Sequence, residues 1–145
     1  FVDKLLLTLD DAIKIRLRSD VLLGAHLSGG LDSTSIVCIA SSLLGNGNIK
    51  TFTGRFNEGP AFDESNYAKL VAKKLGTEYH EITLNAKNFE EVIEDIIYYL
   101  DEPVAGPGAF PQFFVSKLAK EQVKVVLGGQ GGDEIFIGYI RYLIA

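Results

Sequence analysis

Apolar and polar residues follow two kinds of pattern along this chain. Segments whose apolar positions recur every three or four residues predict helices, whereas short apolar or alternating segments predict strands. The helical pattern covers residues 1–18, 33–44, 88–100 and 113–121. It also covers a segment that begins after the FDES sequence and ends at Gly76. The strand pattern covers residues 20–28, 49–56, 77–84 and 123–127.

Strands and helices therefore alternate through the chain. Such alternation predicts a doubly wound α/β fold, in which a parallel sheet is covered by helices on both faces. The length of 145 residues suits one domain. Polar clusters come directly after strands, at 28–33, 53–57 and 128–134. Because open α/β sheets bind ligands at the carboxyl ends of their strands, these clusters form the candidate site.

The first cluster lies in the sequence LSGGLDSTS at 27–35, between a predicted strand and a predicted helix. Gly29 and Gly30 permit positive φ and close approach of a ligand to the backbone. Ser28 and Ser33 supply hydroxyl donors, and the helix adds the positive end of its dipole. Successive amides in such a turn bind anions, so the cluster predicts a cradle for pyrophosphate. The lysine of the Walker pattern is missing, which excludes that kind of phosphate loop.

Asp32 is the unexpected member of this cluster, because a carboxylate repels phosphate. A cation between the two removes the conflict, and Mg²⁺ commonly binds one or two carboxylates together with phosphate oxygens. We therefore interpret Asp32 as a magnesium ligand. The structural alternative is that the glycines form a tight turn and Asp32 caps the helix.

The sequence LGGQGGDE at 127–134 repeats this arrangement after the last predicted strand. Two glycine pairs flank Gln130, and Asp133 and Glu134 follow. If both clusters face one crevice, Asp32 and Asp133 share the magnesium ion. The structural alternative is that Asp133 and Glu134 cap the helix that follows.

Four further side chains could carry chemistry. Cys38 falls on the apolar face of a helix, which favours a core position over a nucleophile. His26 lies in the first predicted strand, where a packed histidine is expected, and His80 has no second ligand at zinc spacing. Arg55 ends the second strand, where contact with a phosphate and a plain surface position are both open.

Composition narrows the range of functions. Hydrophobic residues make up 47% of the chain, which suffices for a buried core. A net charge of −5 argues against a nucleic-acid partner, which needs a basic surface. No apolar run is long enough to cross a membrane, and the single cysteine fits a reducing compartment, so we expect a cytoplasmic protein. The chain begins at Phe1 and contains no methionine, so we expect it to be a piece of a longer protein.

The string SGGLDS at 28–33 is the signature of ATP pyrophosphatases of the PP-loop type, which cleave ATP between its α and β phosphates. Longer segments narrow this resemblance. Four segments resemble the synthetase domain of glutamine-hydrolysing asparagine synthetases, and they follow one another in the same order and at the same spacing. They are LRSDVLLGAHLSGGLDSTSI, FDESNYAKLVAKKLGTEYHEI, LDEPVAGPGAFPQFFVSKLAKE and VKVVLGGQGGDEIFIGYIRY. The resemblance covers residues 1–145 and implies an adenine nucleotide alpha hydrolase-like fold.

The resemblance implies an enzyme that uses ATP and Mg²⁺. In this family the side-chain carboxylate of aspartate attacks the α-phosphorus, pyrophosphate leaves, and ammonia converts the aspartyl-AMP into asparagine. A glutaminase domain is expected in the full-length chain as the source of ammonia, and a homodimer is left open. The resemblance assigns ATP or pyrophosphate binding to Leu27, Ser28, Gly29, Gly30, Asp32, Ser33, Thr53, Gly54, Gly128 and Gly129, metal binding to Asp32 and Asp133, and catalytic roles to Gln130, Asp32 and Asp133.

This sequence departs from the family pattern in three places. Gln130 stands where relatives usually have Glu or Asp, and an amide can hydrogen-bond but cannot take a proton. Gly106 and Gly108 stand where relatives often have Asp and Ser, within a glycine- and proline-rich loop at 101–111 that we expect to act as a lid. Gly128 replaces the serine of an LSG sequence.

These departures leave two alternatives open. One is a related enzyme that forms an amide or a lactam from another carboxylate. The other is a degenerate nucleotide-binding module without catalysis.

Overall fold

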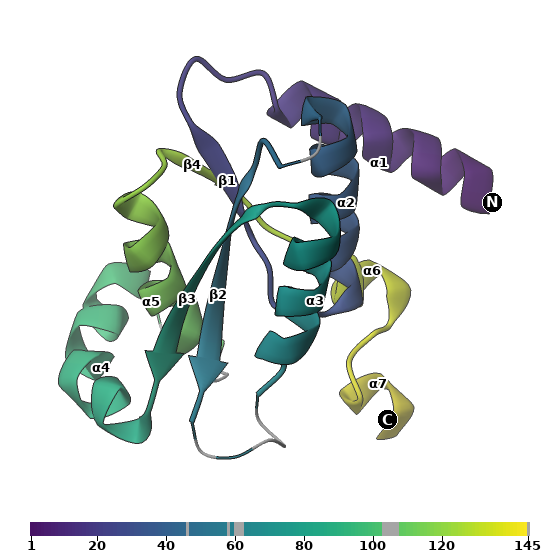
Figure 1. Cartoon of the computed structure of the whole chain (residues 1–145). Helices are drawn as coiled ribbons and strands as arrows, with labels where there is room; N and C mark the ends of the chain where they lie inside the picture. Colours follow the sequence, from purple (N-terminus) through teal and green to yellow (C-terminus); the bar gives the residue numbers. More distant parts are fainter. Residues whose placement is uncertain (46, 58, 60–62, 103–107, 145) are drawn as a thin grey trace.

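The computed structural model describes residues 1–45, 47–57, 59, 63–102 and 108–144 (Figure 1). Its centre is a four-stranded sheet in the order β3-β2-β1-β4, and every pairing is parallel. Ala25 at the centre of the sheet lies opposite Thr51 on one side and Leu127 on the other. The strands are β1 (Leu23–His26), β2 (Lys50–Phe56), β3 (Glu78–Leu84) and β4 (Val125–Leu127).

Helices cover both faces of the sheet, which confirms the predicted doubly wound α/β fold. One face carries α1 (Val2–Arg16), α2 (Leu31–Leu44) and α3 (Ser65–Leu75) (Figure 1). The other carries α4 (Ala86–Leu100) and α5 (Ala109–Lys120), of which α5 contacts β2 and β3 directly. Each face has its own core. The larger core includes Ile13, Leu27, Val37 and Ala68, and the smaller one includes Phe52, Val115, Ala119 and Val123.

The order of the strands creates a crevice beside β1. The chain moves from β1 to β2 and β3 on one side, and it returns to β4 on the other side. Connections that leave neighbouring strands in opposite directions open a space at their carboxyl ends, and open α/β sheets bind ligands there. Both glycine-rich clusters follow these two strands, as α2 begins at Leu31 and the short α6 (Gly132–Phe136) begins after β4.

Local hydrogen bonds move several element ends away from their predicted positions. β1 is shorter than residues 20–28, because the Ser19 side chain bonds with the backbone of Val21 just before it. α4 begins at Ala86 rather than at 88, since Asn85 and Asn88 each accept a hydrogen bond from the other's backbone amide.

α5 begins at Ala109, inside the segment at 101–111 that was expected to be a loop. Pro111 lies in its first turn, where an amide hydrogen is not needed. Gly106, which belongs to the same expected lid, lies outside the described residues. A four-residue helix, α7 (Arg141–Ile144), was not predicted.

Two burial predictions were wrong. Cys38 is exposed rather than in the core. Val37 and Ala40 face the sheet, and the next residue after Val37 is rotated by about 100° around the helix. The apolar residues at three- and four-residue spacing within 1–18 predict one buried stripe, yet in α1 only Ile13 is buried, and Val2 and Leu6 of that stripe are more than half exposed. Among the described helices, none has the length and apolar character needed to cross a bilayer.

Candidate functional site

The loop between β1 and α2 is held by its own hydroxyl groups. The oxygens of Ser28 and Ser33 lie 2.9 Å apart, and the Ser33 hydroxyl also accepts a hydrogen bond of 3.2 Å from the Ser28 amide. The Ser33 hydroxyl donates in turn to the Gly30 carbonyl at 3.3 Å. The serines therefore fix the shape of the loop over the first turn of α2, whose positive dipole end faces the crevice.

The two glycines of this loop have different roles. Gly29 has φ of +94°, and a Cβ there would lie 2.9 Å from the Tyr67 Cβ and 3.0 Å from the Ala68 backbone nitrogen. Gly30 has φ of −69°, and an added Cβ would meet only the Ser28 hydroxyl, at 3.4 Å. Of the two glycines that permit positive φ, Gly29 therefore adopts it and Gly30 does not, and at Gly30 the fold leaves space for a Cβ.

The second glycine-rich corner packs directly against the first. A Cβ on Gly129 would lie 2.8 Å from the Ser33 backbone nitrogen and 3.0 Å from the Asp32 carbonyl carbon. A Cβ on Gly132 would overlap the Asp32 carboxylate. These two glycines thus allow the corner after β4 to reach the start of α2, which brings both corners into one crevice.

A cavity of about 620 Å³ lies between the two corners. Asp32, Gln130 and Asp133 line it together, as the sequence predicted on the condition that both clusters face the same space. Its other lining residues include Ser28, Gly30, Ser33, Gly129, Phe136 and Tyr139. This cavity is called the first cavity below.

The three carboxylates that line the first cavity differ in their hydrogen-bond partners. Glu134 accepts hydrogen bonds from the Gly131 amide at 3.1 Å and from the Tyr139 hydroxyl at 2.7 Å, so it serves the fold around α6. In the described part of the chain, no hydrogen bond or ion pair involves the side chain of Asp32 or of Asp133. The capping alternative is therefore borne out for Glu134 and is not supported for the two aspartates.

Two carboxylates from separate corners suit magnesium. This ion takes one or two carboxylates and completes its shell with phosphate oxygens and water. Among the described residues, no group of three or more candidate metal ligands gathers at one point. Asp32 and Asp133 therefore fit an ion that arrives with a nucleotide better than an ion held by protein side chains alone.

A second cavity of about 370 Å³ lies beside the first, at the carboxyl ends of β1 and β2. Leu27, Thr53 and Gly54, three of the residues to which the resemblance assigns ATP or pyrophosphate binding, all line it. The Thr53 hydroxyl donates a buried hydrogen bond of 2.6 Å to the Leu27 carbonyl, which ties the two strand ends together. Phe52, Phe56 and Val115 give this cavity an apolar wall of the kind that suits a flat ring.

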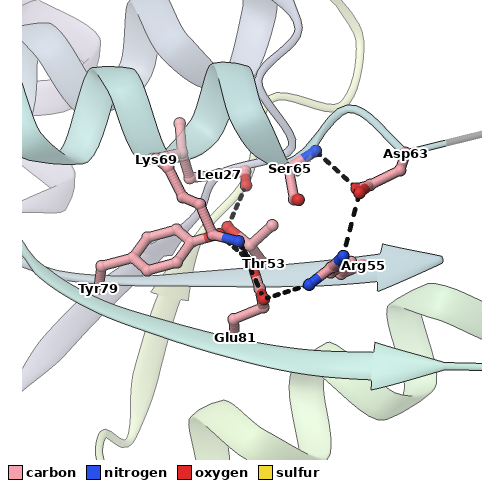
Figure 2. A network of polar contacts seen from close by, with 8 residues as sticks. All are labelled: Leu27, Thr53, Arg55, Asp63, Ser65, Lys69, Tyr79 and Glu81. Carbon is pink, nitrogen blue, oxygen red and sulfur yellow. Dashed lines mark hydrogen bonds and ion pairs between the residues drawn. The ribbon is translucent and has the colours of Figure 1, made fainter. Parts of the chain in front are cut away.

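A network of ion pairs and hydrogen bonds connects β2 and β3 with α3 and with Asp63, which precedes α3 (Figure 2). Arg55 contacts Asp63 at 3.3 Å and Glu81 at 4.0 Å, so its guanidinium is occupied by protein carboxylates. Glu81 also binds Lys69 at 2.8 Å and accepts a hydrogen bond of 2.8 Å from Tyr79. Burial raises the pKa of Tyr79, and the hydrogen bond to Glu81 raises it further.

Asp63 fixes the start of α3. Its Oδ1 accepts a hydrogen bond of 3.0 Å from the Ser65 amide (Figure 2). Hydrogen bonding from Ser65, through its side chain and its backbone amide, lowers the pKa of Asp63, and Arg55 adds to this effect. The sequence predicted such a helix start from the aspartate in FDES.

Two residues that line both cavities were not identified as site residues from the sequence. His26 was expected to be a packed histidine, yet it is only half-buried, and burial lowers its pKa. Gln112 lies in the first turn of α5, and its Nε2 is 3.2 Å from His26 Nδ1. No sequence pattern marks Gln112, because the packing of α5 on the sheet brings it to a strand that is 86 residues away.

Two of the predicted binding residues line neither cavity. Gly29 packs against α3, and a side chain on Gly128 would overlap the side chain of Gln130. Ser28, Gly30, Ser33 and Gly129 all line the first cavity.

The fold and the site define an α/β protein of the adenine nucleotide alpha hydrolase-like class. The family model described as Asparagine synthase matches residues 4–145, so the chain belongs to the asparagine synthase family.

Similar proteins agree with this assignment. A Methanocaldococcus jannaschii protein with an asparagine synthetase (glutamine-hydrolysing) name is 42% identical over 133 residues, which is 92% of this chain and 25% of that protein. Asparagine synthetase (glutamine-hydrolysing) 1 of Bacillus subtilis is 39% identical over 132 residues, which is 91% of this chain and 20% of that protein. The chain thus spans a quarter or less of the length of these relatives.

A solved structure supports the fold alone. The NH3-dependent NAD synthetase from Campylobacter jejuni superimposes with a TM-score of 0.60 at 17% identity, over 94% of this chain and 60% of that protein.

Proposed function

We propose that this chain forms the ATP-binding part of an enzyme that activates the side-chain carboxylate of aspartate and converts it into the amide of asparagine. The observation that carries the proposal is the meeting of the two glycine-rich corners, which bring Asp32 and Asp133 to one cavity. Membership of the asparagine synthase family supports the same chemistry.

In the proposed complex, ATP spans both cavities. The adenine lies in the second cavity against Leu27, Thr53 and Gly54. The β and γ phosphates lie in the first, over Ser28, Gly30 and Ser33, where the start of α2 favours negative charge. Gly29 shapes this loop from outside the cavity, Gly128 makes room for the Gln130 side chain, and Gly129 lets the second corner pack on the start of α2.

Magnesium would be held by Asp32 and Asp133, and it would supply positive charge beside the phosphates. An oxygen of the aspartate side chain attacks the α-phosphorus, and the bond between that phosphorus and the bridging oxygen of pyrophosphate breaks. Negative charge then develops on the leaving pyrophosphate. Donors placed where charge develops lower the barrier, which is the role we assign to the loop amides and the α2 terminus.

In the second step, the nitrogen of ammonia attacks the acyl carbon of aspartyl-AMP, and the bond from that carbon to the AMP oxygen breaks. The nitrogen loses a proton at this point, and the phosphate of the departing AMP takes it up. Gln130 lines the first cavity and can orient ammonia by hydrogen bonding, although its amide cannot accept the proton. We expect Gln130→Glu to raise the rate about a hundredfold if proton acceptance limits turnover.

The first experiment is titration calorimetry of MgATP, with Asp32→Ala as the variant and Asp3→Ala, a distant residue at the start of α1, as its control. We expect Mg²⁺-dependent binding that Asp32→Ala weakens and Asp3→Ala does not. Binding that ignores Mg²⁺, or that both variants retain, would contradict the proposed site.

The second experiment is turnover by the full-length protein. Aspartate, ammonia and MgATP should yield asparagine, AMP and pyrophosphate in equal amounts. A panel of other carboxylic acids is assayed for AMP release in parallel. Release with another acid and none with aspartate would instead favour the alternative of a related amide- or lactam-forming enzyme, and no release with any acid would favour a module without catalysis.

A further inference from the structure

A line of hydrogen bonds joins β1, α5 and the corner after β4. Gln112 Nε2 is 3.2 Å from His26 Nδ1, and Gln130 Nε2 is 3.4 Å from Gln112 Oε1. These three side chains are called the His26 relay below. All three line the first cavity, and His26 and Gln112 also line the second, so the relay lies at the boundary between the two.

The chemistry of the groups fixes the direction of these bonds. With Gln112 Nε2 as the donor, His26 Nδ1 accepts, which puts the imidazole proton on Nε2, a buried atom without a hydrogen-bond partner among the described residues. Gln112 Oε1 only accepts, so Gln130 donates through Nε2. Burial lowers the pKa of His26, which favours the neutral ring that this arrangement requires. Each residue therefore sets the orientation of the next, from His26 to Gln130.

The relay uses the amide nitrogen of Gln130 and leaves its carbonyl oxygen out of these bonds. This oxygen, Oε1, lies next to Gly128, at the place that a Cβ on Gly128 would take. Gly128 therefore provides the space in which this carbonyl sits. Two departures from the family pattern, Gln130 and Gly128, are thus parts of one arrangement.

We propose that His26 and Gln112 are positioning residues, and that they hold Gln130 so that its carbonyl oxygen accepts a hydrogen bond from the attacking ammonia. This inference rests on the proposed function. A fixed acceptor directs one N–H of ammonia away from the acyl carbon and leaves the nitrogen lone pair free to attack it. The C–N bond forms as the C–O bond to AMP breaks, and the surplus proton passes to the departing phosphate rather than to Gln130.

The test separates the two half-reactions in the full-length protein. Aspartate-dependent exchange of pyrophosphate into ATP reports the first step, and the KM for ammonia at saturating aspartate and MgATP reports the second. His26→Phe keeps a ring and removes the Nδ1 acceptor, whereas His26→Asn places an oxygen near the former Nδ1. His80→Phe, at the other histidine of the described chain, is the matched control.

We expect His26→Phe to raise the KM for ammonia about five- to tenfold, the scale of one hydrogen bond, and to leave pyrophosphate exchange unchanged. His26→Asn should restore the ammonia KM to within about twofold, and His80→Phe should change neither quantity. Gln112→Leu should reproduce the effect of His26→Phe, with Gln122→Leu, at a glutamine that contacts Lys50, as its control.

Three results would overturn the inference. The first is an unchanged ammonia KM in His26→Phe and Gln112→Leu. The second is an equal loss of exchange and amide formation, which would indicate a general packing role. The third is a failure of His26→Asn to restore the ammonia KM. Absence of exchange in the wild type would instead overturn the proposed function.

Nuclear magnetic resonance of ¹⁵N-labelled histidine tests the relay without activity, with the His26 signal assigned by its loss in His26→Asn. We expect a neutral ring protonated at Nε2 in the wild type and a mixture of tautomers in Gln112→Leu. A ring protonated at Nδ1 in the wild type would refute the direction of the hydrogen bonds.

Discussion

Replacing Gly30 by alanine separates the two reasons for which a loop can contain glycine. The backbone at Gly30 has φ of −69°, and a Cβ would meet only the Ser28 hydroxyl, at an ordinary contact distance of 3.4 Å. Alanine in a compatible conformation restricts the unfolded chain, but Gly30 is also the N-cap of α2, where alanine is less favourable than glycine. The two effects oppose each other, so the free energy of unfolding should change by less than about 1 kcal/mol, and the fold gives only a small reason for glycine here.

A bound phosphate does give a reason. The added methyl group would lie in the loop that lines the first cavity and would keep phosphate oxygens from the backbone amides. We expect Gly30→Ala to weaken MgATP binding at least tenfold, which corresponds to about 1.4 kcal/mol. The assay pairs calorimetric titration of MgATP with thermal unfolding of the same samples.

Gly29→Ala provides the contrast. Its φ of +94° costs a residue other than glycine about 1–3 kcal/mol, and the Cβ would also press on the backbone of α3. This variant should therefore lose several degrees in Tm, whereas Gly30→Ala should not. Normal MgATP binding by a stable Gly30→Ala protein would refute the assignment of this loop to phosphate. A loss of Tm in Gly30→Ala as large as that in Gly29→Ala would refute our account of its backbone.

Four further predictions concern the surroundings of the site. Thr53→Val removes the buried 2.6 Å bond to Leu27 and should cost about 1–3 kcal/mol in urea unfolding, whereas the exposed Thr8→Val should cost little. Asp32→Asn should weaken ATP binding at least tenfold with Mg²⁺ present and leave binding without Mg²⁺ unchanged, as calorimetry would show. Gly129→Ala should lower both Tm and MgATP affinity, because its Cβ would lie 2.8 Å from the Ser33 nitrogen. Hydrogen bonds from Ser65 lower the pKa of Asp63 in the folded state. This carboxylate therefore stabilises the fold above its unfolded pKa of about 3.9, and the stabilisation is lost as pH falls through the folded pKa. The Tm difference between wild type and Asp63→Asn should accordingly shrink in acid.

The sheet could be predicted from the sequence because its strands are short apolar or alternating segments between helical ones. This pattern reports burial, which the tertiary structure preserves. Element ends depend instead on single contacts, such as the reciprocal bonds of Asn85 and Asn88, which periodicity does not register. For the same reason the pattern misplaced Cys38, since a rotation of one residue around α2 separates a buried position from an exposed one.

The sequence predicted the site residues that follow strands but missed one that lies on a helix. Asp32 and Asp133 could be paired because each follows a strand, and parallel strands end at the same edge of a sheet. Gln112 could not be found in this way, because its place beside His26 follows from how α5 packs across the sheet. Topology brings strand ends together in a regular manner, whereas helix packing does not.

The glycines of the two corners illustrate how composition can mislead even where it identifies the right segment. Each glycine pair was interpreted as room for a ligand, yet Gly129 and Gly132 make room for the first corner itself. The Asp32 carboxylate lies where a side chain on residue 132 would be, so the position of a proposed metal ligand depends on a glycine that is 100 residues away. Both glycines follow β4, and the pairing of β4 with β1 brings them to the first corner. The cavity between the corners should therefore form only when β4 has paired with β1, which couples assembly of the site to completion of the sheet.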